Sequence, residues 1–219
     1  MKIFLTADLH STEHWYQWIV DNQKYYDVVI IAGDMVDMFK NEVENAKITP
    51  YLSQIKNLIY CSGNHDFSCD GDMKHYLYKD YMFSTIPFMY EENDRLLHCI
   101  KLFLDRGLEL KENRKWVLIS HEPAFKTDYP GYGEIIRKLV NRYKINWVFS
   151  GHIHHFPYTA EAVFKDDEHF NFLPGCNSQA TQPNHIVIEN NIAQWKYTYK
   201  GGLWQVNYNI SDFEVNKMK

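Results

Sequence analysis

The stretch Ser62-Gly63-Asn64-His65-Asp66 directly follows the apolar run Leu58-Ile59-Tyr60-Cys61. A short run of β-prone residues that ends abruptly in glycine and polar side chains indicates a buried strand that leads into a loop. Asn64 can offer a neutral amide oxygen to a hard cation, and His65 can bind or release a proton near neutral pH. One such loop is weak evidence of function, so the interpretation depends on whether the pattern recurs.

Four other predicted strands end in the same way. They cover residues 2–7, 27–32, 116–119 and 147–149. The polar residues that follow them are Asp8 and His10, Asp34 and Asp37, His121, and His152 and His154. Five strand ends with the same chemistry favour one shared explanation over five unrelated turns.

The segments between these strands show helical spacing of apolar residues. We expect a helix capped by Ser11 or Thr12, a second that begins near Pro50, a third over residues 92–107 and a fourth over residues 135–143. Residues 67–92 have no clear period and are expected to form a loop-rich insertion with one short strand. Four β-prone runs follow, at residues 161–164, 170–173, 185–189 and 193–199, and the end of the chain after residue 208 is expected to fray.

Composition limits the class of protein. The chain has 219 residues, of which 45% are hydrophobic and 23% charged, as in a globular protein with a real core. We expect a single domain over residues 1–219, because no linker or repeat divides it. The formal charge of −5 and the lack of a Lys/Arg block make nucleic acid an unlikely partner.

The sequence also carries a prediction of location. The four cysteines show no paired spacing, and we find neither a signal peptide nor an apolar run of transmembrane length. We therefore expect a cytoplasmic protein with reduced thiols and no membrane association.

Alternating strands and helices predict largely parallel sheets, whose carboxyl ends meet at one edge where ligands bind. That edge collects carboxylate, imidazole and amide groups without a thiolate, a mixture that suits Mn, Fe or Zn. Seven of these residues are candidate ligands, which is more than one ion needs: Asp8, His10, Asp34, Asn64, His121, His152 and His154. Two ions about 3.5–4 Å apart that share a carboxylate would use them all. Such a pair can hold a phosphate and activate a bridging water, which leaves His65 to protonate the leaving oxygen.

Each fragment by itself has a simpler structural interpretation. Asp8-x-His10 can be a turn with a polar surface pair, and Gly33-Asp34 can begin a turn or cap a helix. His152 and His154 can be a chance pair on an exposed loop. These explanations must all hold independently, whereas one dinuclear site accounts for the five loops and their order together.

The ordered set of motifs resembles the signature of the calcineurin-like metallophosphoesterase superfamily over residues 1 to about 155. The motifs are Asp8-x-His10, Gly33-Asp34-x-x-Asp37, Gly63-Asn64-His65-Asp66, His121 and Gly151-His152-x-His154. The resemblance implies an α/β fold of four layers, an αββα sandwich of two mixed sheets flanked by helices, with the metal site at the carboxyl edge of the strands.

The resemblance also implies roles for individual residues. Asp8, His10 and His154 would bind one of two divalent ions (Mn, Fe or Zn). Asn64, His121 and His152 would bind the other, and Asp34 would bridge them. His65 would act as the acid, Asp37 would orient it, and Asp66 would support the loop.

From these observations we expect a hydrolase that cleaves a phosphate ester by attack of a metal-bridged hydroxide. A phosphodiesterase of small substrates, nucleotides included, is favoured because the chain is compact. A phosphomonoesterase, a phosphoprotein phosphatase and, in another class, a non-catalytic metal-bound interaction module remain alternatives. His155 and six aromatic residues near the loops are candidate substrate contacts: Phe67, Tyr90, Tyr129, Tyr132, Phe156 and Tyr158.

Overall fold

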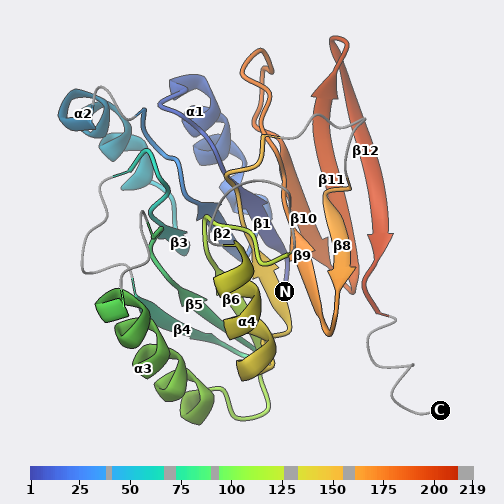
Figure 1. The fold of residues 1–219 in the computed structure, drawn as a ribbon. Helices are drawn as coiled ribbons and strands as arrows, with labels where there is room; N and C mark the ends of the chain where they lie inside the picture. The colour runs from blue at the N-terminus through green and yellow to red at the C-terminus, as the bar shows by residue number, and fades with distance from the viewer. Residues whose placement is uncertain (38–40, 67–72, 90–93, 126–132, 155–160, 212–219) are drawn as a thin grey trace.

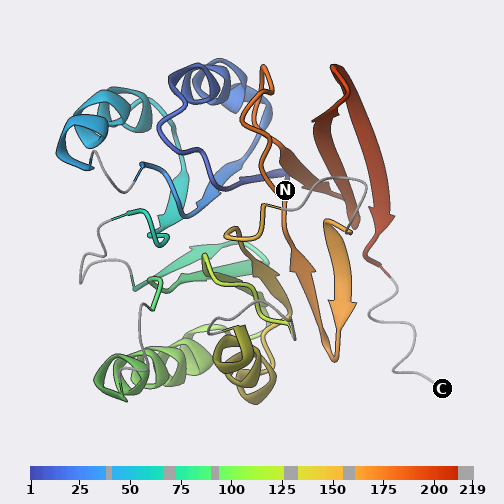
Figure 2. The ribbon, with the colours of Figure 1, turned by 45° about the horizontal axis from the view of Figure 1, so that its top comes forward.

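Two six-stranded sheets pack face to face, and a pair of helices covers the outer face of each sheet (Figures 1 and 2). The structure is a computed structural model that describes residues 1–37, 41–66, 73–89, 94–125, 133–154 and 161–211. Figure 2 shows the four layers, with α1 and α2 on one side and α3 and α4 on the other. The expected four-layer sandwich is therefore confirmed.

The elements follow in chain order. The first half contains β1 (Ile3–Thr6), α1 (Glu13–Asn22), a 3₁₀ turn (Gln23–Tyr25), β2 (Val28–Ala32), α2 (Asn41–Leu52), β3 (Leu58–Cys61), β4 (Lys74–Tyr78), β5 (Tyr81–Thr85) and α3 (Asp94–Leu110). The second half contains β6 (Lys115–Ile119), α4 (Gly133–Tyr143), β7 (Trp147–Phe149), β8 (Val163–Asp166), β9 (His169–Phe172), β10 (His185–Glu189), β11 (Ile192–Tyr199) and β12 (Gly202–Asn209).

Both sheets are mixed, with a parallel half that carries the polar loops. The first sheet has the order β12-β11-β10-β1-β2-β3, in which β1, β2 and β3 are parallel and β10 to β12 are antiparallel. The second has the order β4-β5-β6-β7-β9-β8, in which only the edge strands β4 and β8 are antiparallel. The carboxyl ends of β1, β2, β3, β6 and β7 can therefore meet at one edge of the sandwich.

The central strands are buried on both faces. In β1, Ile3 and Leu5 lie in the apolar core between the sheets, whereas Phe4 packs on the other side against residues of α1. In β6, Val117 and Ile119 face the first sheet, and Leu118 packs beneath α4. This double burial explains why these strands read as continuous apolar runs in the sequence.

The helix that we expected to begin near Pro50 begins at Asn41 instead, and Pro50 lies in its last turn. The polar residues before Pro50 concealed the start, because the helix buries only a narrow strip that includes Ile48. Pro50 has no N–H for the i→i−4 hydrogen bond of a helix, and the helix ends two residues after it.

The prediction of one short strand within residues 67–92 is wrong. The structure has the hairpin of β4 and β5, with five residue pairs from Lys74–Thr85 to Tyr78–Tyr81. Residues 82–85 are all buried, so the sequence shows no two-residue alternation there. Residues 67–72 and 90–92 of this stretch lie outside the described part of the chain.

A further strand, β12, was not expected and pairs with β11 over eight positions. Most of its side chains are exposed, so it lacks the apolar pattern of a buried strand. The frayed end predicted beyond residue 208 falls partly on this strand and partly on residues 212–219, which are not described. No helix in the described part of the chain has both the length and the apolar character needed to cross a bilayer.

The inner face of the second sheet offers a test of this packing. Phe83 is fully buried between the sheets. Phe83→Ala should lower the free energy of unfolding by about 3–5 kcal/mol, because it leaves a cavity in the core. Urea unfolding is the measurement, with Leu102→Ala as the control, since Leu102 is 55% exposed on α3. Equal losses for the two variants would contradict the assigned core.

Candidate metal centre

The nine residues singled out as ligands or catalytic groups form one connected group at the carboxyl edge of the strands. Contacts of 2.8–4.0 Å link every member to at least one other. They come from the loops that follow β1, β2, β3, β6 and β7. The convergence expected from the strand order is therefore present in the structure.

The loops that hold this group have unusual backbone conformations. Asp8, His10, Asp34 and His152 have φ angles of 55°, 42°, 49° and 67°, in the left-handed region that non-glycine residues rarely adopt. Each such residue costs free energy, so the conformation needs support. The amide of Asp8 donates to the Gly33 carbonyl at 3.1 Å, and that of His10 donates to the Asp34 carbonyl at 3.0 Å. These bonds join the loops after β1 and β2.

Three loop glycines allow the loops to pack closely. Gly33 has φ of 84°, which a side chain would disfavour. A Cβ on Gly63 would overlap the backbone and carboxylate of Asp34, and one on Gly151 would lie 2.9 Å from the Ala32 carbonyl oxygen. These three glycines therefore let the backbone of one loop pack directly against candidate ligands of another. Of the three, only Gly33 has a positive φ.

Asp66 links the loops after β2 and β3 by hydrogen bonds. Its carboxylate accepts hydrogen bonds from the backbone N–H groups of Met35 at 2.9 Å, Val36 at 3.0 Å and Gly63 at 2.8 Å. Burial raises the pKa of Asp66, partly offset by these hydrogen bonds. Asp66 thus acts on the loops that carry Asp34 and Asn64.

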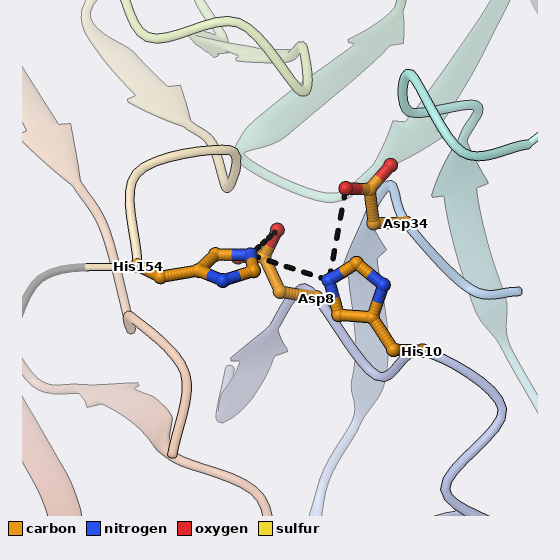
Figure 3. A group of neighbouring side chains, drawn as sticks. All are labelled: Asp8, His10, Asp34 and His154. Carbon is orange, nitrogen blue, oxygen red and sulfur yellow. Dashed lines mark hydrogen bonds and ion pairs between the residues drawn. The ribbon is translucent and has the colours of Figure 1, made fainter. Parts of the chain in front are cut away.

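One subset of the group has the arrangement of a cation site (Figure 3). Ligand atoms of Asp8, His10, Asp34 and His154 all lie within 4.8 Å of one another. His154 Nε2 lies 3.2 Å from both Asp8 Oδ1 and His10 Nε2. Buried Asp8 Oδ2 has no hydrogen-bond partner among the described residues. A divalent cation fits this donor set, because it would satisfy the orphaned oxygen and the converging nitrogens together.

The remaining ligand candidates gather around Asn64. His121 Nε2 lies 2.9 Å from Asn64 Oδ1 and 3.2 Å from Asp34 Oδ2, and His152 Nδ1 lies 2.8 Å from Asn64 Oδ1. The other nitrogen of His121, Nδ1, donates to the Ala32 carbonyl at 2.8 Å, which leaves Nε2 facing the group. Asp34 Oδ2 also lies 3.8 Å from His10 Nε2, so this oxygen stands between the two subsets.

The electrostatics centre on Asp34 and His121. Burial opposes ionisation of Asp34, but the hydrogen bond and charge of His121 outweigh it and lower the pKa of Asp34 to about 2. Burial also opposes charge on His121, yet Asp34 raises the pKa of His121 to about 9. Burial lowers the pKa of His10 and His152, which keeps their lone pairs available to a cation. A proton on His121 thus occupies, in the metal-free protein, the place where a cation would neutralise Asp34.

His65 lies at the edge of this group of nine residues. Its Nε2 is 4.0 Å from Asp34 Oδ2, and its Nδ1 is 3.9 Å from Asp37 Oδ1. The side chain of Asp37 is 49% exposed, so these two residues border solvent.

The amide of Asp37 donates to Ser11 Oγ at 3.3 Å. Thr12, one of the two residues expected to cap α1, holds the cap position but makes no side-chain hydrogen bond there, and the Ser11 hydroxyl accepts from Asp37 instead.

Sequence reasoning missed two neighbours of the centre. The buried carboxylate of Glu122 lies 3.9 Å from His152 Nε2, although Glu122 directly follows His121 in the chain. The ring of Phe88 lies 5.8 Å from that of His121 and 5.4 Å from that of His152, and no pattern marked it. The suggested contacts His155, Phe67, Tyr90, Tyr129, Tyr132, Phe156 and Tyr158 lie outside the described residues.

Comparison with known proteins identifies the family. The model of the calcineurin-like phosphoesterase family matches residues 1–156. The chain belongs to the calcineurin-like phosphoesterase family. It is therefore, by class, a hydrolase that acts on phosphate esters. No curated protein matches this phosphoesterase in sequence.

Solved structures share the fold at low sequence identity. A protein of Thermus thermophilus superposes with a TM-score of 0.62 at 11% identity, covering 94% of this chain and 98% of that one. Purple acid phosphatase from yellow lupin (Lupinus luteus) seeds gives 0.59 at 9% identity, and the match covers 94% of this chain but only 53% of that chain. Vacuolar Protein Sorting 29 from Cryptosporidium parvum gives 0.51 at 11% identity, covering 95% and 97%. These likenesses show the fold of the phosphoesterase and nothing narrower.

The pair of Asp34 and His121 predicts a pH effect on the metal-free phosphoesterase. A histidine whose pKa rises from 6.5 to about 9 on folding stabilises the folded state fully below pH 6.5 and loses this contribution as the pH rises through 9. The free energy of unfolding should fall across this range by on the order of 2–3 kcal/mol. Urea unfolding at several pH values measures it. Asp34→Asn should flatten the profile, and a flat wild-type profile would contradict the pairing.

Gly63 gives a second test. Gly63→Ala should displace Asp34 and lower the free energy of unfolding by about 1–3 kcal/mol, because its Cβ overlaps Asp34. Gly202→Ala is the matched control, since a Cβ there meets its nearest atom at an ordinary 3.5 Å. Thermal or urea unfolding compares the two, and unchanged stability in Gly63→Ala would show that the loops are not packed as described.

Proposed function

We propose that this phosphoesterase is a phosphodiesterase of small substrates, nucleotides among them, that works with two divalent ions. Asp8, His10 and His154 hold one ion. Asn64, His121 and His152 hold the other, and Asp34 bridges them. The observation that carries the proposal is the position of Asp34 Oδ2, 3.8 Å from His10 Nε2 and 3.2 Å from His121 Nε2, at the junction of the two ligand subsets.

The ions, when bound, supply charge neutralisation for the phosphate and an activated water; Mn, Fe and Zn all suit these ligands. The protein supplies the proton. His65 stands at the solvent border of the centre and can donate from its ring to the leaving oxygen. Asp37, on the other side of that ring, orients the imidazole.

The described residues offer no alternative thiol nucleophile at the centre. Cys176 is a thiol beside it, and its Sγ donates to the Asp8 carbonyl at 3.3 Å. Burial, together with the charges of Asp8 and Asp34, raises the pKa of Cys176 to about 12, so this sulfur stays protonated. Direct attack by water is therefore favoured over a cysteinyl intermediate.

The charge of the site supports a diester. Asp8 and Asp34 already bring two negative charges. The charged groups that act on the histidines of the centre are Asp, Glu and His, with no Lys or Arg among them in the described part of the chain. A phosphate monoester adds two negative charges near neutral pH, whereas a diester adds one. The diester thus makes the smaller demand on the positive charge that two divalent ions would leave after Asp8 and Asp34 are neutralised.

Turnover of bis(p-nitrophenyl) phosphate and p-nitrophenyl phosphate tests the proposal. Metal-depleted protein should be inactive, and added Mn²⁺ should restore cleavage with preference for the diester. His65→Ala should lower kcat by about 10²- to 10⁴-fold on a cyclic nucleotide, whose leaving alkoxide must be protonated, and less on the p-nitrophenyl esters, whose phenolate leaves without a proton, while two ions stay bound. Metal content is measured alongside the rate.

His98→Ala on the exposed face of α3 is the matched control and should retain full activity. Preference for the monoester would redirect the proposal to a phosphatase. Tight binding of two ions without turnover of either compound would support the non-catalytic interaction module instead.

A further inference from the structure

Glu122 is a buried carboxylate beside the proposed metal centre. It lies in the loop after β6 and is only 4% exposed. Its Oε1 accepts the backbone N–H of Gly133 at 3.1 Å, and Gly133 is the first residue of α4. The free N–H groups at a helix start favour a negative charge there. Glu122 is thus held at one oxygen by the helix.

The second oxygen faces a proposed ligand. Glu122 Oε2 lies 3.9 Å from His152 Nε2, within ion-pair distance. The other nitrogen of the same ring, Nδ1, lies 2.8 Å from Asn64 Oδ1. The His152 ring therefore stands between Glu122 and the metal centre, with one nitrogen toward each.

Gly133 makes this arrangement possible. A Cβ at Gly133 would lie 2.9 Å from the Pro123 carbonyl oxygen and 3.3 Å from that of Phe125. Both distances are shorter than ordinary contacts, so a larger residue would push the start of α4 away from Glu122. The close approach of the helix keeps the carboxylate in place.

We propose that Glu122 is a positioning residue for His152. Its Oε2, 3.9 Å from His152 Nε2, is the acceptor toward which Nε2–H points, and this favours the tautomer whose lone pair on Nδ1 points to the second ion. This inference rests on the proposed function, because it assigns His152 to that ion. Histidine ligands usually need such a partner to hold their orientation, and its loss typically weakens metal affinity 10- to 100-fold.

The comparison with His121 supports this role. His121 donates from Nδ1 to the Ala32 carbonyl at 2.8 Å and presents Nε2 to the centre. His152 is oriented the other way, with Nδ1 toward the centre. The two histidines proposed for the same ion thus use opposite nitrogens, each set by the acceptor behind it: a backbone carbonyl for His121 and Glu122 for His152.

Calorimetric titration of metal-depleted protein with Mn²⁺ tests the proposal. The wild type should bind two ions. Glu122→Ala should bind one ion with unchanged affinity and the second about 10- to 100-fold more weakly. Glu122→Gln keeps an oxygen acceptor and should lose less, so it also serves if Glu122→Ala fails to fold. Glu134→Ala, an exposed carboxylate on the same helix, is the matched control and should match the wild type.

A spectroscopic readout separates positioning from a general structural effect. In Zn²⁺-loaded protein labelled with ¹⁵N at histidine, His152 should be the Nε2–H tautomer in the wild type, and its ring signals should change in Glu122→Gln. A merely structural role would instead lower the melting temperature and weaken both ions equally. The inference would be overturned if the Glu122 variants bound two ions at wild-type affinity and showed unchanged His152 signals. Diester cleavage by the wild type would in that case leave the proposed function intact. A wild type that binds fewer than two ions would overturn both.

Discussion

The burial of the Asp34 carboxylate is the constraint on which the site depends. An ionised carboxylate that is 2% exposed needs partners of positive or donor character. His121 supplies one at 3.2 Å, and the His65 amide supplies another at 2.9 Å. These partners come from both sheets, so the ionised carboxylate links the two layers of the sandwich at the carboxyl edge of their strands.

The same constraint explains the backbone of the loops. Asp8, Asp34 and His152 adopt left-handed conformations that are unfavourable for residues with a side chain. Hydrogen bonds between loops offset this cost, among them that from the His152 amide to Asp8 Oδ1 at 3.0 Å. Close packing at Gly63 and Gly151 leaves no space for another arrangement. A site with strained loops and an orphaned carboxylate oxygen is one prepared for a cation.

Much of this organisation could be predicted from sequence, and the failures have physical causes. The strands β1, β2, β6 and β7 are buried on both faces, so their apolar runs were plain to read, whereas β3, also expected to be buried, is an edge strand with Tyr60 exposed. The start of α2 was missed because the helix buries only a narrow strip, the β4–β5 hairpin because residues 82–85 are buried without alternation, and β12 because most of its side chains are exposed. Ser11 or Thr12 was expected to cap α1. Thr12 holds that position without a side-chain hydrogen bond, and the Ser11 hydroxyl accepts from the Asp37 amide, a contact that local spacing does not reveal.

The sequence by itself determined which side chains are the candidates for the site and in what order they occur, because ligand chemistry belongs to residue type and strand ends are marked locally by Gly and polar residues. Only the tertiary structure decided which nitrogen of each histidine faces the centre, that Asp34 stands between two ligand subsets, and that Glu122 lies behind His152. These features depend on contacts between segments far apart in the chain, such as His121 with Ala32 and His152 with Asn64. Local pattern carries no information about the distance or direction of such contacts, which are set when the two sheets pack together.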